Sequence, residues 1–103
     1  MEQTILRLVN QFFELGKKMK QKEDASYERQ MGRLAETFIE MGYEFHDPHM
    51  EAYNDTRTDC EASISGNGKG TLYISEVIKP LVIRNEEGRK TIIQKAVVIV
   101  ESA

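Results

Sequence analysis

The feature that most constrains this chain is a change of hydrophobic period at Gly42. Before Gly42, apolar residues recur at steps of three and four, which is the spacing of amphipathic helices. After Gly42 that period disappears, and runs rich in β-branched residues predict strands instead. The sequence therefore predicts an α+β fold, with a helical hairpin followed by a small antiparallel β domain.

Two apolar stripes define the helical part. The first predicts a helix from about residue 2 to 21, and it consists of Ile5, Leu8, Val9, Phe12, Phe13 and Met19. The second predicts a helix that ends at Met41, with Gly42 as its C-cap glycine, and it consists of Tyr27, Met31, Leu34, Phe38 and Ile39. The stretch "KEDAS" between them is a polar loop that offers Asp24 and Ser26 as helix caps.

Each apolar stripe is wide and contains aromatic residues, so the two helices cannot bury both stripes by packing against each other. A second copy of the hairpin would cover them by forming a four-helix bundle, so we expect a homodimer. The alternative is a monomer in which the helices pack only on the strands. The candidate dimer-interface residues are Ile5, Leu8, Phe12, Met31, Leu34 and Phe38.

The remaining sequence divides into a connector and a β part. We expect a helical hairpin over 1–42, a polar connector over 43–56 that contains Pro48, and a β domain over 57–103. "DCEASIS" alternates weakly and "GNGKG" is a glycine-rich turn. "TLYISEVIKPLVI" and "TIIQKAVVIV" predict a hairpin closed by "RNEEGR", with Gly88 available for a positive φ angle and Pro80 marking an edge or a break.

Composition limits the classes of function. The chain is 40% apolar and 30% charged, as folded proteins are, and its net charge of −3 argues against a general nucleic-acid binder. No apolar run is long enough to cross a membrane, no secretion signal is evident, and the single Cys60 fits a reducing compartment. We therefore expect a cytoplasmic protein. The hairpin is locally basic, which fits either an ordinary solvated turn or a patch that meets an acidic partner; its bases are Lys79, Arg84, Arg89, Lys90 and Lys95.

The candidate chemistry in the sequence is weak. His46 and His49 could be drawn into a metal site, but two histidines beside Pro48 are more typical of a connector. Cys60 has the setting of a small buried residue, and "GNGKG" lacks the ending of a phosphate-binding loop. The aromatic residues of this half fit a core better than a base-stacking surface; they are Tyr43, Phe45, Tyr53 and Tyr73. We expect no enzymatic activity, no metal and no cofactor.

The order of these parts resembles the GrpE family of nucleotide exchange factors. The match begins with the helix pair and Gly42, and continues with Asp47–Pro48 and Glu51–Ala52. It ends with Gly70–Thr71, Glu76–Val77–Ile78, Gly88–Arg89 and the valine-rich run 97–100. The resemblance covers nearly the whole chain, and it corresponds to a short form without the family's long first helix.

The resemblance implies a co-chaperone in protein folding and the stress response. It would bind the ATPase domain of a DnaK-type heat-shock chaperone and promote ADP release, dimerising through the helices and contacting the chaperone through the β domain. Motif position assigns partner contacts to Ile78, Arg89 and Val100. Lys79 joins them because of the local basic charge alone.

Several positions depart from the family pattern. Met50 replaces a histidine, "KPLV" follows the Glu-Val strand in place of Lys-Gly-Tyr, and "QKA" at 94–96 replaces Arg-Pro-Ala. These positions fall on or beside the surface expected to contact the chaperone. The alternative function is therefore a dimeric binding or assembly module that has the GrpE fold without exchange activity.

Overall fold

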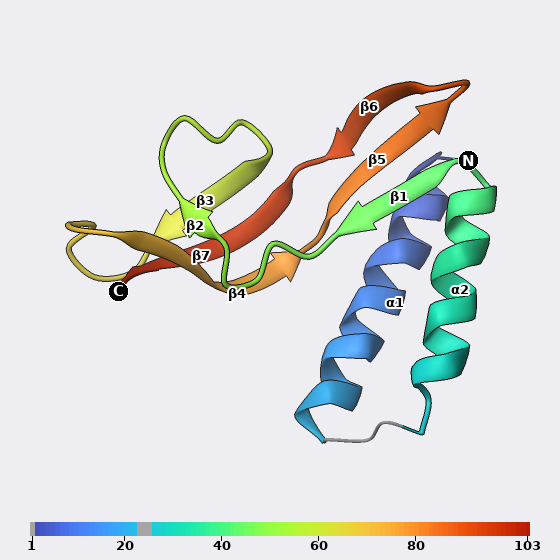
Figure 1. Ribbon diagram of the computed structural model, residues 1–103, viewed down its shortest axis with the longest axis horizontal. Coiled ribbons are helices and arrows are strands. Elements are labelled where there is room, and N and C mark those ends of the chain that lie inside the picture. The colour runs from blue at the N-terminus through green and yellow to red at the C-terminus, as the bar shows by residue number, and fades with distance from the viewer. Residues whose placement is uncertain (1, 23–25) are drawn as a thin grey trace.

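The computed structural model describes residues 2–22 and 26–103, and it contains two helices followed by seven strands (Figure 1). The helices are α1 (Glu2–Gln21) and α2 (Glu28–Glu40). The strands are β1 (Tyr43–His46), β2 (Ala52–Tyr53), β3 (Cys60–Ile64), β4 (Leu72–Lys79), β5 (Leu81–Glu86), β6 (Arg89–Gln94) and β7 (Ala96–Ser102). The expected α+β class and the order of helices before strands are confirmed.

The two helices agree closely with the hydrophobic stripes. α2 stops where Gly42 adopts a φ angle of +92° and its N–H bonds to the carbonyl of Ile39 at 2.9 Å, so the expected cap glycine is confirmed. A Cβ atom at Gly42 would lie 3.1 Å from the carbonyl oxygen of Asn85, so a larger residue is disfavoured by space as well as by φ. At the other end of α2 the N-cap is Tyr27, without a side-chain cap bond, and Asp24 lies outside the described residues.

A long two-stranded ribbon forms the centre of the β part. One side of the ribbon is β4 followed by β5, and the other side is β6 followed by β7. Both sides of the ribbon are interrupted at corresponding positions, at Pro80 on one side and at Lys95 on the other. We call this position the bend. Because proline lacks an N–H and cannot complete a ladder, Pro80 separates two strands that the sequence suggested as one.

The bend assigns the two halves of the ribbon to different sheets. Beyond the bend, β5 and β6 form a three-stranded sheet in the order β1-β5-β6. Before the bend, β4 and β7 form a four-stranded sheet in the order β2-β4-β7-β3. The pair β3–β7 is parallel, with Cys60 opposite Ala96, which corrects the expectation of a purely antiparallel domain. A parallel neighbour is possible here because a long connection joins β3 to β7.

Two strands lie inside the segment expected to be a connector. β1 pairs antiparallel with β5, and β2 pairs with β4, so residues 43–56 belong partly to both sheets. The expected hairpin loop "RNEEGR" is also shorter than predicted, because only Glu87 and Gly88 lie outside β5 and β6. The glycine-rich stretch after β3 is a turn as expected, with positive φ angles at Gly66, Gly68 and Gly70.

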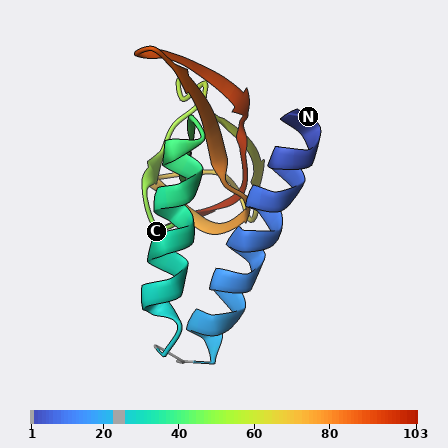
Figure 2. The ribbon, with the colours of Figure 1, turned by 90° about the vertical axis from the view of Figure 1, so that its right-hand side faces the viewer.

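The core consists of two clusters that α1 connects. Val9 packs with Phe38 of α2 and Val82 of β5, against the three-stranded sheet. Phe13, one turn further along α1, packs against the four-stranded sheet. Figures 1 and 2 show both helices extending past the strands, so that the end of α1 and the start of α2 lie at the opposite end of the molecule from the tip of the β5–β6 hairpin.

Candidate functional site

The β5–β6 hairpin ends in a tight two-residue turn. Glu87 and Gly88 have φ angles of +52° and +84°, which are the signs required of both central residues in a type I′ turn. The Gly88 N–H also donates to the side-chain oxygen of Asn85 at 3.1 Å. The expected positive φ at Gly88 is confirmed, and the turn places Arg89 in an exposed position at the tip of the hairpin.

The structure separates the residues expected to contact a partner. Ile78 and Lys79 are exposed at the end of β4, beside the bend. Arg89 lies at the far end of the hairpin, about 20 Å away at the rise per residue of a strand. Val100 is completely buried in the four-stranded sheet, so its side chain is part of the core and cannot belong to an exposed contact surface. This placement corrects the sequence-based expectation for Val100.

Some basic residues of the hairpin form ion pairs and others do not. Arg84 pairs with Glu86 at 3.1 Å and with Glu2 at the start of α1, and the hydrogen bond to Glu2 raises the pKa of Arg84 above its ordinary value. Lys90 lies 3.6 Å from Glu44. No ion pair within residues 2–22 and 26–103 involves the remaining bases Lys79, Arg89 and Lys95. The basic charge that remains unpaired is therefore at the tip and at the bend.

An amide pair attaches α1 to the bend. The Asn10 side-chain N–H donates to Gln94 at 3.0 Å, and the Gln94 side-chain N–H donates back to Asn10 at 2.9 Å. The same Gln94 nitrogen lies 2.9 Å from the carbonyl oxygen of Pro80. Sequence reasoning treated Gln94 only as a departure from the family pattern, whereas the structure makes it the residue that connects helix, bend and β6. Lys17 adds a second attachment by donating to the carbonyl of Val77 at 2.8 Å.

The residues expected at a dimer interface divide into two sets. Phe12 and Phe38 contact each other and Phe45, with ring centroids 5.4 to 6.1 Å apart, and Ile5 packs beside them. These residues are part of the helix–sheet core. Leu8 and Leu34, in contrast, are 50% and 48% exposed. The helices therefore pack on the strands while keeping an outer apolar face.

That outer face has regular spacing. Leu8 and Leu15 are seven residues apart on α1. Leu34 of α2 and Met41, the residue directly after α2, are also seven residues apart. The two residues of each pair therefore lie on the same side of their helix. All four side chains are close to half exposed. A stripe of this kind is typical of helices that pack against further helices.

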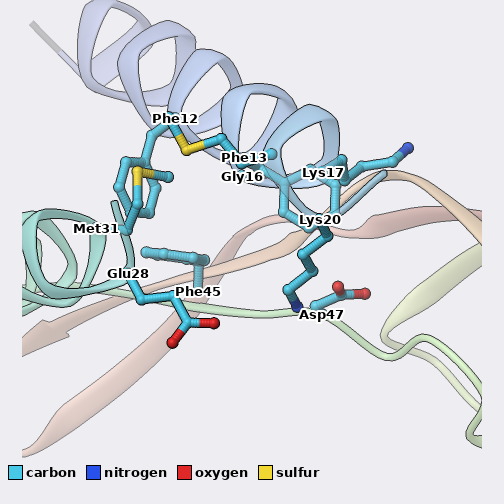
Figure 3. Close-up of a pocket in the computed structure, with 10 residues that line it drawn as sticks. Phe12, Phe13, Gly16, Lys17, Lys20, Glu28, Met31, Phe45 and Asp47 are labelled. Carbon is cyan, nitrogen blue, oxygen red and sulfur yellow. The ribbon is translucent and has the colours of Figure 1, made fainter. Parts of the chain in front are cut away.

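A groove of about 580 Å³ lies between the two helices and the end of β1 (Figure 3). Its wall is largely apolar, and the expected interface residue Met31 is part of it, beside Phe12 and Phe45. A Cβ atom on Gly16 would approach the Met31 methyl group to 3.3 Å, so Gly16 allows Met31 to lie close to α1. Both signs of charge line the groove, through Lys17, Lys20, Glu28 and Asp47, and its residues do not specify a ligand charge.

His46 and the charged side chains of Glu51, Arg57 and Asp59 form a structural network. Arg57 pairs with Glu51 at 3.1 Å and with Asp59 at 3.0 Å, and the Glu51 carboxylate lies 2.5 Å from His46. The hydrogen bond from Arg57 lowers the pKa of Asp59 below its ordinary value. Within the described part of the chain no three His, Cys, Asp or Glu side chains are arranged to hold a metal ion.

Comparison of the chain with protein-family models, curated proteins and solved structures finds no match. Neither helix, over the residues that the structure describes, has the length and apolar character needed to span a membrane.

Proposed function

We propose that this chain is a GrpE-like co-chaperone, which binds the ATPase domain of a DnaK-type chaperone and promotes release of ADP. The observation that carries the proposal is the exposed Arg89 at the tip of the projecting β5–β6 hairpin. Gly88–Arg89 is one of the motifs on which the family resemblance depends, and its type I′ turn would present the guanidinium group to a partner. A guanidinium recognises a partner carboxylate through paired hydrogen bonds.

The contact surface in this proposal runs along the ribbon from the tip to the bend. Arg89 occupies one end, and Ile78 with Lys79 occupies the other. Ile78 is 44% exposed, which gives the surface an apolar point beside its unpaired basic charge. Positive charge at both ends would steer the hairpin towards an acidic partner surface.

An exchange factor of this kind needs no reactive group, because it works by differential binding. If the hairpin binds the open nucleotide cleft better than the closed one, ADP affinity falls by the same factor. A preference of about 1.4 kcal/mol for the open state weakens ADP tenfold. A rigid surface favours such a preference, and the two attachments of α1 to the ribbon, through Gln94 and Val77, contribute to that rigidity.

The test is stopped-flow release of fluorescent ADP from a DnaK-type ATPase domain. We expect the wild-type chain to accelerate release, and we expect Arg89→Glu to abolish most of the acceleration while remaining folded. Lys69→Glu is the matched control, because Lys69 is exposed in the loop between β3 and β4, at the opposite end of the ribbon. Failure of the wild-type chain to accelerate release at tens of micromolar would contradict the proposal, as would equal effects of the two variants.

The second candidate is a dimeric binding module with this fold and without exchange activity. The half-exposed stripe of Leu8, Leu15, Leu34 and Met41 favours it, because a second copy would cover these side chains in a four-helix bundle. Leu34→Asp should then give a folded monomer by light scattering, and Glu36→Lys, a charge change at an exposed α2 position, should leave the dimer intact. A wild-type chain that remains monomeric at high micromolar concentration would contradict this candidate.

A further inference from the structure

One edge of the ribbon is only half covered. Along β7, the side opposite β4 is occupied by β3, which pairs with it from Cys60 to Ile64. On the other side of the bend, β6 continues the side of the ribbon that β7 forms. β6 is the terminal strand of its sheet. In the part of the chain that the structure describes, no strand pairs with β6 on the side where β3 pairs with β7. An unpaired strand edge is a template for another extended segment.

The register shows which backbone groups of β6 face this vacant edge. In a hairpin closed by a two-residue turn, the flanking pair Glu86–Arg89 exchanges both hydrogen bonds, and such pairs alternate along the ladder. The next pair is Asn85–Lys90, and the Asn85 N–H indeed points away from β6, to the Gly42 carbonyl at 2.7 Å. Its partner Lys90 therefore directs its N–H and C=O outward.

The alternation continues to Ile92. Its partner on β5 is Ile83. The N–H and C=O of Ile83, like those of Asn85, point towards β1 and away from β6. The N–H groups of Lys90 and Ile92 are thus both available at the open edge, whereas those of Arg89 and Thr91 point into the hairpin. Arg89, Lys90, Thr91 and Ile92 are all exposed, and β6 contains no proline to block pairing.

The charge of the β6 edge indicates which kind of segment could pair with it. Arg89 and Lys90 begin β6 and Lys95 follows it, with no acidic residue from Gly88 to Val100. Of the nearby acids on neighbouring elements, Glu86 pairs with Arg84 and Glu44 pairs with Lys90, while Glu87 lies in the turn. Pairing β6 with β6 of a second copy would bring these bases together, which is unfavourable. An acidic segment is favoured.

We propose that β6 is a docking edge for an extended acidic segment of a partner protein, which adds as a fourth strand to the sheet β1-β5-β6. The main-chain groups of Lys90 and Ile92 would hold the segment, and Arg89 and Lys95 would pair with its acidic side chains. Ile92, 46% exposed, provides an apolar contact between the charges. This inference concerns the edge of the ribbon and does not depend on nucleotide exchange.

The first experiment measures binding of a short fluorescent peptide in which Glu alternates with Val and Thr. We expect saturable binding at low salt that weakens as salt rises, because the charge pairs are exposed. A peptide with Lys in place of every Glu should not bind. Absence of binding by the acidic peptide, or equal binding of the two peptides, would overturn the proposal.

The second experiment separates the backbone from the side chain. Ile92→Pro removes the outward N–H and leaves the hydrogen bonds of the β5–β6 ladder in place, whereas Ile92→Thr removes most of the apolar side chain and keeps the N–H. We expect the proline variant to bind the acidic peptide about tenfold more weakly than the threonine variant. Equal affinities would overturn a strand-addition mode.

Amide hydrogen exchange of the wild-type protein gives an answer even if Ile92→Pro does not fold. We expect the Lys90 and Ile92 amides to exchange rapidly in the free protein and slowly when the acidic peptide is bound. The Thr91 amide, which points into the hairpin, should change much less. Protection elsewhere in the chain without protection of Lys90 and Ile92 would overturn the proposal.

Discussion

The two halves of the ribbon share β-branched residues and have different surroundings. β6 contains Thr91, Ile92 and Ile93, and β7 contains a run of valines, so both are rich in β-branched residues. In β7 the alternate residues Ala96, Val98 and Val100 are at most 1% exposed. In β6, Ile92 is 46% exposed.

The difference teaches that neighbouring elements, together with composition, decide which of these β-branched residues are buried. β7 has β4 on one side and β3 on the other, and Phe13 of α1 packs with its buried residues. β6 has β5 alone. Most of the ribbon's buried residues therefore lie before the bend, and we propose that the open edge beyond the bend is used for recognition.

The largest expected effect comes from truncating matched isoleucines in the two halves. Ile74 in β4 is fully buried, so Ile74→Ala should lower the free energy of unfolding by about 2–5 kcal/mol. Ile92→Ala, at an exposed position, should lower it by less than about 1 kcal/mol. Urea denaturation measures both values, and similar losses in the two variants would contradict the division of the ribbon.

A smaller effect is expected at the bend, where α1 is attached. Asn10→Ala and Gln94→Ala should each lower stability by about 1 kcal/mol, because each leaves partly buried amide groups without their partner. Gln94→Ala should have the larger effect, since it also removes the bond to Pro80.

The double mutant at the bend isolates the amide pair. It should lose less stability than the sum of the two single mutants, because the two side chains bond to each other. Strictly additive losses in chemical denaturation would show that Asn10 and Gln94 act independently, and that α1 is held at the bend by packing alone.

The smallest expected effect concerns Arg57 and Asp59, which connect the outer strands of the four-stranded sheet. Arg57 holds the pKa of Asp59 below its ordinary value of 3.8 in the folded state. The pair therefore stabilises the fold above about pH 4, and this contribution is lost as the pH falls through the folded-state pKa. Since both groups are partly exposed, the contribution should be about 1 kcal/mol or less.

Urea denaturation of the wild type and Asp59→Asn over a series of pH values measures this contribution. The stability difference should be constant above pH 4 and shrink below it. Asp55→Asn is the control, because Asp55 forms no ion pair with any described residue. A difference for Asp59→Asn that does not change with pH would contradict the role of the ion pair.

Local signals in the sequence predicted several elements correctly. The bounds of α1, the cap glycine Gly42, the positive φ angle at Gly88 and the glycine-rich turn after β3 all depend on neighbouring residues alone. For such features the helical period and the conformational freedom of glycine are sufficient.

Other features depend on long-range pairing, and the sequence did not reveal them. β1 has only four residues, which is a short signal by itself, and its pairing with β5 is what makes it a strand. The parallel pairing of β3 with β7 and the division of the ribbon between two sheets likewise arise from contacts distant in sequence.

The candidate site shows the same limit. Arg89 lies at an exposed tip, because a turn motif that is evident in the sequence fixes its position locally. Val100 was assigned to the surface although β3 and β4 enclose it on both sides. Gln94 was overlooked, since its partners Asn10 and Pro80 are not its neighbours in sequence.

The most direct test of the central claim is amide hydrogen exchange of the chain with and without a nucleotide-free DnaK-type ATPase domain. The account predicts that binding slows exchange at residues 78–79 and 88–94 and leaves the β7 amides unchanged. Protection confined to α1 and α2, or no protection anywhere, would contradict the proposal that the ribbon from the bend to the hairpin tip is the recognition surface.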